Sequence, residues 1–354
     1  MKRKAKPLFY ILVFFALVLF VGGGTWMYLA SPVDRNDKSE IEVVVPSGAT
    51  STKIGTILKE KELIRSELLF KVYLKMNHVG SLKASTYKLN KTMDLNTIIE
   101  TLEKGNTYNP DAIQITFREG ERITSYAEEI ASKTNHTYEE VIAVFQDHEY
   151  VKGLVGKYWF LTESILNPDL YYPLEGYLAP DTYQFMNADV TIDEIIDTLL
   201  KQNEKRLEPY KVTIEKDPHY YLTMASMADL EGSNTDNRMM IVGIFENRLK
   251  KGMNLGSDVT SYYGVQASMK NDITAEQLAD VNPYNTRLAS MAGKMPAGPI
   301  CNPSNSSIQA SVSPTASDYY FFVADKHGKI YYTKTASEHE KKIQEIKANG
   351  DWIW

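Results

Sequence analysis

The feature that most constrains this chain is a run of 22 residues, 8–29, that contains no charged side chain. As a helix rising about 1.5 Å per residue, the run would reach roughly 33 Å, enough to cross a hydrocarbon core of about 30 Å. Residues of mixed charge follow the run, and four basic residues precede it: Lys2, Arg3, Lys4 and Lys6. By the positive-inside rule, these charges predict a short cytoplasmic tail over residues 1–7 and export of the rest of the chain.

A cleaved signal peptide is the alternative interpretation of the same run. The run is long for the apolar part of a signal peptide, and residues 28–31 make a poor cleavage site. We therefore expect a single uncleaved transmembrane helix over residues 8–29, followed by a linker over residues 30–39.

The composition of the 354 residues is that of an ordinary globular protein, with 43% hydrophobic and 24% charged residues, and the length suffices for two domains. The net charge of −6 gives no reason to expect nucleic acid as a partner. Cys301 is the only cysteine, so no intrachain disulfide can form, and we expect its side chain to be packing. The sequence contains no His-Glu-x-x-His, P-loop or Gly-x-Ser-x-Gly motif, so we expect no metal ion and no cofactor.

An apolar helical pattern over residues 221–231 stops at a carboxylate, Glu231, and Gly232 follows at once. We expect Gly232 to adopt the left-handed conformation that ends many helices. The partial negative charge of a helix C-terminus, together with partial burial, would raise the pKa of Glu231, as a proton-donating group requires. On spacing alone, a solvated surface carboxylate remains the simpler interpretation.

A second amphipathic helical pattern follows, with Thr235 or Asp236 as its N-cap and an end at residues 250–252. The two patterns predict a helical hairpin with Glu231 at its bend.

Several motifs occur in a fixed order along the second half of the chain. They are E-G-Y-L-A-P-D-T-Y at 175–183, A-S-x-x-x-x-E at 225–231, F-x-N-R-L-x-x-G-M-x-L-x-S-D at 245–258, Y-N-T at 284–286 and P-A-G-P-I-x-N-P at 296–303. In this order, and with the strand at 320–325, the chain resembles the YceG-like (MltG) family of endolytic murein transglycosylases. The resemblance covers essentially everything after residue 40.

The resemblance implies a catalytic role for Glu231, which matches the second glutamate of the family's E-x-E. Glu231 would protonate the glycosidic oxygen between MurNAc and GlcNAc and then, as a base, help the C6 hydroxyl to close a 1,6-anhydro ring. The chain departs from the family's pattern at three positions, Asp229, Gly256 and Val259, where the family often has Glu, Gln and Pro. The departure at Asp229 concerns a supporting carboxylate and leaves the acid in place.

Other positions match the family's motifs without a settled role. Asp229 and Asp258 are the candidates for a second carboxylate, if one is used. By the resemblance, Asn285 would lie in the cleft and donate a hydrogen bond to substrate. Glu175 and Asp181 could contact substrate or could brace loops. We expect Arg248 to pair with a carboxylate structurally, although contact with sugar is the alternative.

The predicted fold class is α+β, with the transmembrane helix, a small LysM-like β-α module over residues 40–108 and a mixed α+β catalytic domain over residues 109–354. The helical hairpin of Glu231 lies in this catalytic domain. Alternating and apolar segments near 318–333 predict a β-hairpin, and Ser337 to Glu340 predicts a capping box that opens a final helix. The LysM-like module could bind glycan, or it could be a spacer that packs on the catalytic domain.

The leading hypothesis is a lytic transglycosylase anchored in the cell membrane of a bacterium, with its catalytic domain outside the cytoplasm. It would cut nascent peptidoglycan strands and so terminate glycan elongation, near peptidoglycan synthases and the elongation or division machinery. One alternative is a muramidase that hydrolyses the same bond. Another is a peptidoglycan-binding scaffold without catalysis, which the three departures from the family's pattern leave open.

Overall fold

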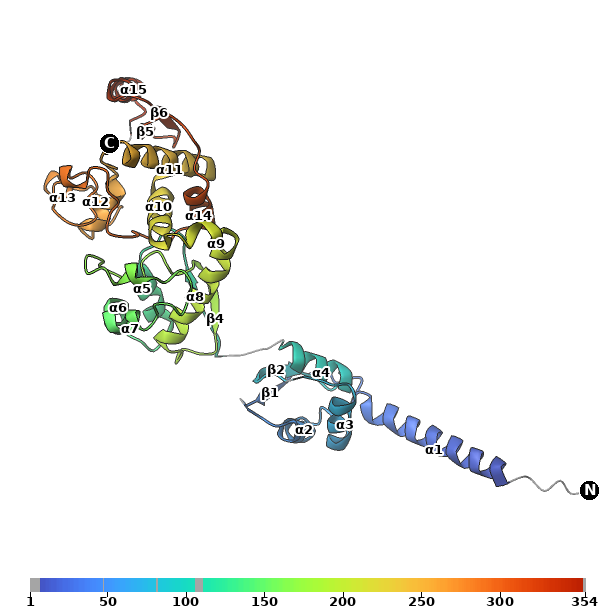
Figure 1. Ribbon diagram of the computed structural model, residues 1–354. Coiled ribbons are helices and arrows are strands. Elements are labelled where there is room, and N and C mark those ends of the chain that lie inside the picture. Colours follow the sequence, from blue (N-terminus) through green and yellow to red (C-terminus); the bar gives the residue numbers. More distant parts are fainter. Residues whose placement is uncertain (1–6, 47, 81, 106–110, 353–354) are drawn as a thin grey trace, which may run out of the picture. The chain divides into compact units, whose positions relative to one another are not determined.

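The computed structural model describes residues 7–46, 48–80, 82–105 and 111–352, and the side chains of the first helix only at 14 and 20–30. The chain divides into two compact units, one ending at Ala112 and one covering Ile113–Trp354. Each unit combines helices with two-stranded antiparallel sheets (Figure 1). The predicted domain boundary after residue 108 lies outside the described residues, as does the predicted tail apart from Pro7.

The first helix, α1 (Pro7–Ala30), corrects one prediction. Counting only the residues that the structure describes, no helix is long and apolar enough to cross a membrane. This finding contradicts the transmembrane helix that we predicted over residues 8–29. The C-terminal end of α1 packs on its own unit instead: Trp26 and Leu29 contact the hydrophobic core, and the rings of Trp26 and Tyr73 stack with centroids 6.5 Å apart. Trp26 and Leu29, which we assigned to lipid, therefore contact protein, whereas Phe14, Phe20 and Met27 are exposed.

The rest of the first unit has a β-α-α-β order with one further helix. Its elements are β1 (Ile41–Val45), α2 (Ser51–Glu60), α3 (Glu67–Met76), β2 (Ser85–Leu89) and α4 (Leu95–Lys104). The strands pair antiparallel, with Val43 opposite Tyr87, and both of these side chains are buried. Alternate strand residues and one stripe of each helix form a single core, as period-2 and period-3.6 apolar patterns require.

The second unit begins with a sheet whose strands are far apart in the sequence. β3 (Ile113–Phe117) pairs antiparallel with β4 (Asp181–Phe185). The helices around this sheet are α5 (Ile123–Lys133), α6 (Tyr138–Gln146), α7 (His148–Lys152), the 3₁₀ turn η1 (Glu163–Leu166), α8 (Ile192–Leu207), the turn η2 (Glu208–Tyr210) and α9 (Lys211–Ile214). Helices α6 and α7 are separated by a single residue. The helix breaks at Asp147, whose side chain accepts hydrogen bonds from the first turn of α7.

Three helices form the centre of the second unit: α10 (Pro218–Glu231), α11 (Thr235–Lys250) and α14 (Asn305–Val312). They lie side by side in Figure 1 and contact one another pairwise. Every residue of α10 from Leu222 to Ala228 is buried, because neighbouring elements cover the helix on several sides. The chain between α11 and α14 contains α12 (Asp258–Gly264), α13 (Ala275–Leu278) and the turn η3 (Ala289–Met291).

The bend of the helical hairpin is present, but its caps differ from our prediction. Gly232 has φ −107° and is extended, so it does not take the left-handed conformation. A Cβ on Gly232 would lie 2.5 Å from Cγ of Arg238, so the glycine is required by the close approach of the two helices. The N-cap of α11 is Asn234, whose side chain accepts from the amide of Asn237.

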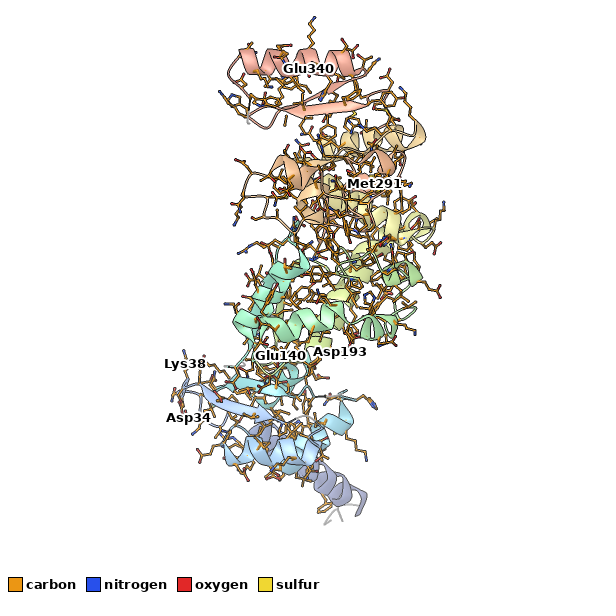
Figure 2. The ribbon with its side chains drawn as sticks, turned by 90° about the vertical axis from the view of Figure 1, so that its left-hand side faces the viewer. Asp34, Lys38, Glu140, Asp193, Met291 and Glu340 are labelled. Atoms are coloured by element: carbon orange, nitrogen blue, oxygen red, sulfur yellow. The ribbon has the colours of Figure 1, made fainter. Side chains whose placement is uncertain are left out.

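The chain ends in a hairpin, β5 (Phe321–Ala324) and β6 (Ile330–Thr333), followed by α15 (Ala336–Ala348), which Glu340 marks in Figure 2. Phe322 packs edge-on against Phe245 of α11, with ring centroids 5.9 Å apart. The capping box of α15 is formed by Thr335 and Glu338, two residues earlier than we predicted.

Candidate active site

Glu231 lies in a pocket of about 460 Å³ within the second unit. Helix α10 places it there as its last residue, at the point where Gly232 turns the chain back towards α11. The side chain is half-buried, so the carboxyl group is partly withdrawn from water yet open to the pocket. The pocket brings Glu231 together with four residues discussed above, Arg248, Gly256, Asp258 and Val259.

The proton affinity of Glu231 is that of a group able to donate a proton near neutral pH. Burial raises its pKa to about 7, and the negative charge of Asp258 acts in the same direction. A hydrogen bond from Ser257 and the positive charge of Arg248 both lower the pKa. We had expected a raised pKa from the helix end and partial burial, and burial is the main cause.

Ser257 orients the carboxyl group. Its hydroxyl, almost fully buried, donates a hydrogen bond of 2.6 Å to Oε1 of Glu231. The amide of Ser257 is in turn held by Oγ1 of Thr286, at 3.1 Å. We missed Ser257 as a site residue, although it lies within the S-D motif that we quoted.

Asp258 lines the same pocket at the first position of α12, where the helix N-terminus favours a negative charge. Its carboxylate forms an ion pair with Arg287, which also lines the pocket. Both side chains are substantially exposed, at 59% and 44%. Asp258 is therefore close enough to influence Glu231 but already has a cationic partner.

Asp229 does not share the pocket with Glu231. Asp229 and Glu231 are two residues apart on α10, so their side chains leave the helix axis in directions about 200° apart. The Asp229 side chain is 3% exposed and pairs with Arg238 at 3.2 Å. Its Oδ1 also accepts hydrogen bonds from the hydroxyls of Ser304 and Ser307. These contacts fasten α10 to α11 and α14, so Asp229 braces the helix that ends at Glu231.

Asn285 is fully buried and lies outside the pocket lining. Its Nδ2 donates to the carbonyl oxygens of Leu278 and Asp280, at 2.9 and 2.7 Å, and its Oδ1 accepts from the hydroxyl of Ser261 at 3.0 Å. The amide group that we expected to meet substrate is therefore occupied by its own loop.

Glu175 is a buried brace between segments that are distant in the sequence. Its carboxyl oxygens accept from the amide of Ile123 at 3.0 and 3.2 Å, from the hydroxyl of Tyr263 at 3.2 Å and from Nδ2 of Asn302 at 3.4 Å. The side chain thereby caps α5 and connects it to α12 and to the loop before α14. Burial raises the pKa of Glu175 to about 8.

Asp181, Cys301 and Arg248 make contacts with other parts of the protein that explain their positions structurally. Asp181 begins β4, is exposed and accepts a long hydrogen bond, 3.4 Å, from Gln202. Cys301 is fully buried, its thiol donates to the carbonyl of Ser226 at 3.4 Å, and burial raises its pKa well above the usual value. Arg248 donates to the carbonyl oxygens of Tyr320, at 2.6 Å, and Leu255. Within the described part of the chain, no carboxylate pairs with Arg248, in contrast to our prediction.

The other wall of the pocket comes from the C-terminal hairpin, α15 and the segment after it. Its lining side chains are mainly apolar or aromatic: Phe322, Val323, Ala324, Ile330, His339, Ile343 and Trp352. None of these residues was predicted as a site residue, although the family's strand at 320–325 includes Phe322, Val323 and Ala324. The pocket thus has one wall that carries the charged groups of Glu231, Asp258 and Arg287, and another wall, from the C-terminal segment, that is mainly apolar or aromatic.

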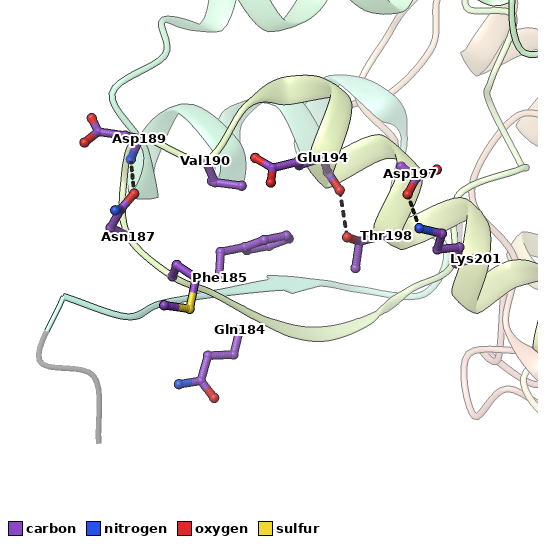
Figure 3. Close-up of a pocket in the computed structure, with 10 residues that line it drawn as sticks. Gln184, Phe185, Asn187, Asp189, Val190, Glu194, Asp197, Thr198 and Lys201 are labelled. Atoms are coloured by element: carbon purple, nitrogen blue, oxygen red, sulfur yellow. Dashed lines mark hydrogen bonds and ion pairs between the residues drawn. The ribbon is translucent and has the colours of Figure 1, made fainter. Parts of the chain in front are cut away.

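A second pocket, of about 570 Å³, lies between the end of β4 and α8 (Figure 3). Its acidic residues are used structurally: Asp197 pairs with Lys201 at 2.5 Å, and Glu194 belongs to the capping box of α8. None of its lining residues is a predicted site residue. Among the residues that the structure describes, no three His, Cys, Asp or Glu side chains are grouped so as to hold a metal ion.

Comparison with known families gives one match that covers most of the chain. The model of the YceG-like family matches residues 43–345. In solved structures, a yceG-like protein from Listeria monocytogenes shares 33% identity with this chain and superposes with a TM-score of 0.61. The match covers 86% of this chain and 99% of the listerial one.

Two curated bacterial proteins are also similar. The endolytic murein transglycosylase of Bacillus subtilis (strain 168) is 36% identical over 326 residues, which cover 90% of this chain and 89% of the relative. The endolytic murein transglycosylase of Streptococcus pneumoniae serotype 2 (strain D39 / NCTC 7466) is 33% identical over 356 residues, or 94% of this chain. The chain spans 64% of the length of that pneumococcal protein.

Proposed function

Because the chain belongs to the YceG-like family, we propose that it is an endolytic murein transglycosylase, a lyase that cuts peptidoglycan glycan strands internally. Two similar curated proteins, from Bacillus subtilis and Streptococcus pneumoniae, carry this name. The pocket around Glu231 supports the same activity, because it presents a partly buried carboxyl group with a raised pKa.

In the proposed reaction, Glu231 acts first as an acid and then as a base. It gives its proton to the glycosidic oxygen while the bond from that oxygen to C1 of MurNAc breaks. The Glu231 carboxylate then takes the proton of the C6 hydroxyl of the same MurNAc, whose oxygen bonds to C1. The product is a 1,6-anhydro end, no water is consumed, and Glu231 is protonated again.

One observation carries this assignment: Glu231 is the carboxyl group of the pocket that forms no ion pair within the described part of the chain, although the charge of Arg248 lowers its pKa. Asp258 pairs with Arg287, and Asp229 points away and pairs with Arg238. Most glycosidases use two carboxylates that flank the scissile bond. A pocket with one unpaired carboxyl fits the single-residue mechanism better, with the N-acetyl group of the substrate assisting at C1.

Product analysis tests the function. The purified full-length chain is incubated with glycan strands from which the peptides have been removed, and the new ends are identified by mass spectrometry. We expect anhydro ends, which are lighter than reducing ends by one water. Reducing ends would identify a hydrolysing muramidase, and strand binding without new ends would identify a scaffold.

The location and partners follow from the substrate in this proposal. Peptidoglycan lies outside the cytoplasm of bacteria, so the second unit would act there, close to peptidoglycan synthases and the elongation or division machinery, where cleavage would terminate strand growth. Glycan binding by the first unit remains a prediction, supported by its β-α-α-β order. Cosedimentation of strands with variants of that unit would test it.

A further inference from the structure

We propose that Trp352 is a stacking platform for one sugar residue of the glycan strand, on the apolar wall of the Glu231 pocket. The proposal rests on the proposed function for the identity of the strand as substrate. Trp352 stands in none of the motifs that we quoted, and it lies four residues after the last residue of α15.

The backbone before Trp352 is tied to the hairpin turn. The amide of Lys326 donates to the carbonyl of Asp351 at 2.8 Å, and Nζ of Lys326 donates to the carbonyl of Gly350 at 2.8 Å. The Asp351 carboxylate pairs with Nζ of Lys326 at 3.1 Å and lies 3.4 Å from Nε2 of His327. These contacts fix Gly350 and Asp351 against the β5–β6 turn and hold Trp352 at the pocket.

The indole itself is held on a defined side. Nζ of Lys347, from the last turn of α15, lies 4.7 Å from the centre of the Trp352 ring, within cation–π range. Trp352 remains only half-buried and lines the pocket together with Ile343. A large aromatic surface is therefore restrained and still accessible to a ligand.

The polar groups on one wall and the apolar surface on the other together fit a sugar ring. Glu231, Asp258 and Arg287 offer charged and hydrogen-bonding groups, whereas Trp352 and its neighbours offer apolar surface. A pyranose ring has hydroxyl groups around its edge and C–H bonds across its faces, so it can satisfy both walls at once. An aromatic ring against the C–H face excludes water from both surfaces at little cost in side-chain entropy.

The test compares Trp352→Phe, which retains an aromatic ring, with Trp352→Leu, which retains apolar volume without a ring. Trp159→Phe is the matched control, since Trp159 also has a lysine over its ring, Lys211 at 5.3 Å, but lies outside the pocket. KM and kcat are measured with peptide-free glycan strands on full-length protein. We expect the Leu variant to raise KM about tenfold at nearly unchanged kcat, and the Phe variant and the control to stay near wild type.

Binding separates this proposal from the proposed function. Affinity for the same strands is measured by cosedimentation with the Trp352 variants placed in a Glu231→Gln background. If wild type cuts no strand and the Leu variant still binds about tenfold more weakly, the platform stands and the proposed function fails. Equal KM and equal affinity for the Leu and Phe variants would overturn the platform, whatever the chain does to the strand.

Discussion

The hydroxyl of Ser257 donates a hydrogen bond of 2.6 Å to Oε1 of Glu231. Because a hydrogen bond to a carboxylate stabilises its charged form, this contact opposes the effect of burial on the pKa of Glu231. Ser257 thus has two roles: it orients the carboxyl group of Glu231, and it keeps the pKa of Glu231 from rising further.

Replacing Ser257 by alanine should raise the pKa of Glu231 above about 7. A hydrogen bond to a charged group contributes about 1.5–3 kcal/mol and one pKa unit about 1.4 kcal/mol, so we expect a shift of about one unit. The rate at the optimum should fall, since the carboxyl group is less well oriented. The pH profile of kcat/KM measures both effects, with its alkaline limb moving to higher pH. Ser311→Ala is the control, because the buried hydroxyl of Ser311 donates to the carbonyl of Ile308 within its own helix, away from Glu231.

Asp258→Asn should move the alkaline limb of the pH profile of kcat/KM to lower pH, in contrast to Ser257→Ala. The negative charge of Asp258 helps to raise the pKa of Glu231, so its removal lowers that pKa, and the unpaired Arg287 lowers it further. A transglycosylase whose acid is Glu231 should then lose activity at a lower pH than wild type. Asp318→Asn removes a comparable exposed ion pair, to Lys334, outside the pocket and should leave the profile unchanged. Complete loss of cleavage by Asp258→Asn at every pH would instead indicate that Asp258 is itself a catalytic group.

Arg238→Gln should destabilise the second unit strongly. It leaves the carboxylate of Asp229, which is 3% exposed, without its cationic partner, and breaking a buried pair typically costs about 3–5 kcal/mol. Arg238 also donates from Nε to the carbonyl of Gly232 at 3.0 Å, next to Glu231, so kcat should fall as well. Thermal unfolding measures the stability. Lys250→Gln breaks an exposed pair with Glu246 and should change it by no more than about 0.5 kcal/mol.

Glu175→Gln should alter how stability depends on pH. The pKa of Glu175 is about 8 in the folded chain, above its ordinary value, so the unfolded chain loses this proton first as the pH rises. The contribution of Glu175 to the free energy of unfolding is therefore fully present at acid pH and is lost as the pH rises from about 4.5 to 8. Relative to wild type, the glutamine variant should gain a few kcal/mol of unfolding free energy between pH 5 and pH 8. Denaturant unfolding at both pH values measures this gain, and Glu128→Gln, on the exposed side of α5, is the control.

The sequence could predict what depends on local pattern. The helices that meet at Glu231 and the C-terminal β-hairpin have clear periodicity or turn residues, and the structure contains them. The Gly232 conformation could not be predicted, because it is set by the approach of Arg238 and not by the helix that it ends.

Long-range contacts decide the rest of the candidate site. Asn285 and Glu175 stand in motifs, but only the folded chain shows that their polar atoms bind neighbouring loops. Trp352 stands in no motif, and its place in the pocket depends on contacts of the segment before it with Lys326. The packing of Trp26 on the first unit likewise depends on Tyr73, which is far away in the sequence.

The most direct test of the account is mass spectrometry of glycan strands incubated with the Glu231→Gln variant beside wild type. Glutamine keeps the shape of the side chain but cannot donate and recover the proton, and general acid-base catalysis contributes about 10² to 10⁴-fold. The control is Glu246→Gln, which changes a glutamate paired with Lys250 outside the pocket. We predict anhydro ends from wild type and from the control, and near-background amounts from a folded Glu231→Gln protein that still binds strands. Anhydro ends released by Glu231→Gln at a rate close to wild type would contradict the assignment of Glu231 as the catalytic acid and base.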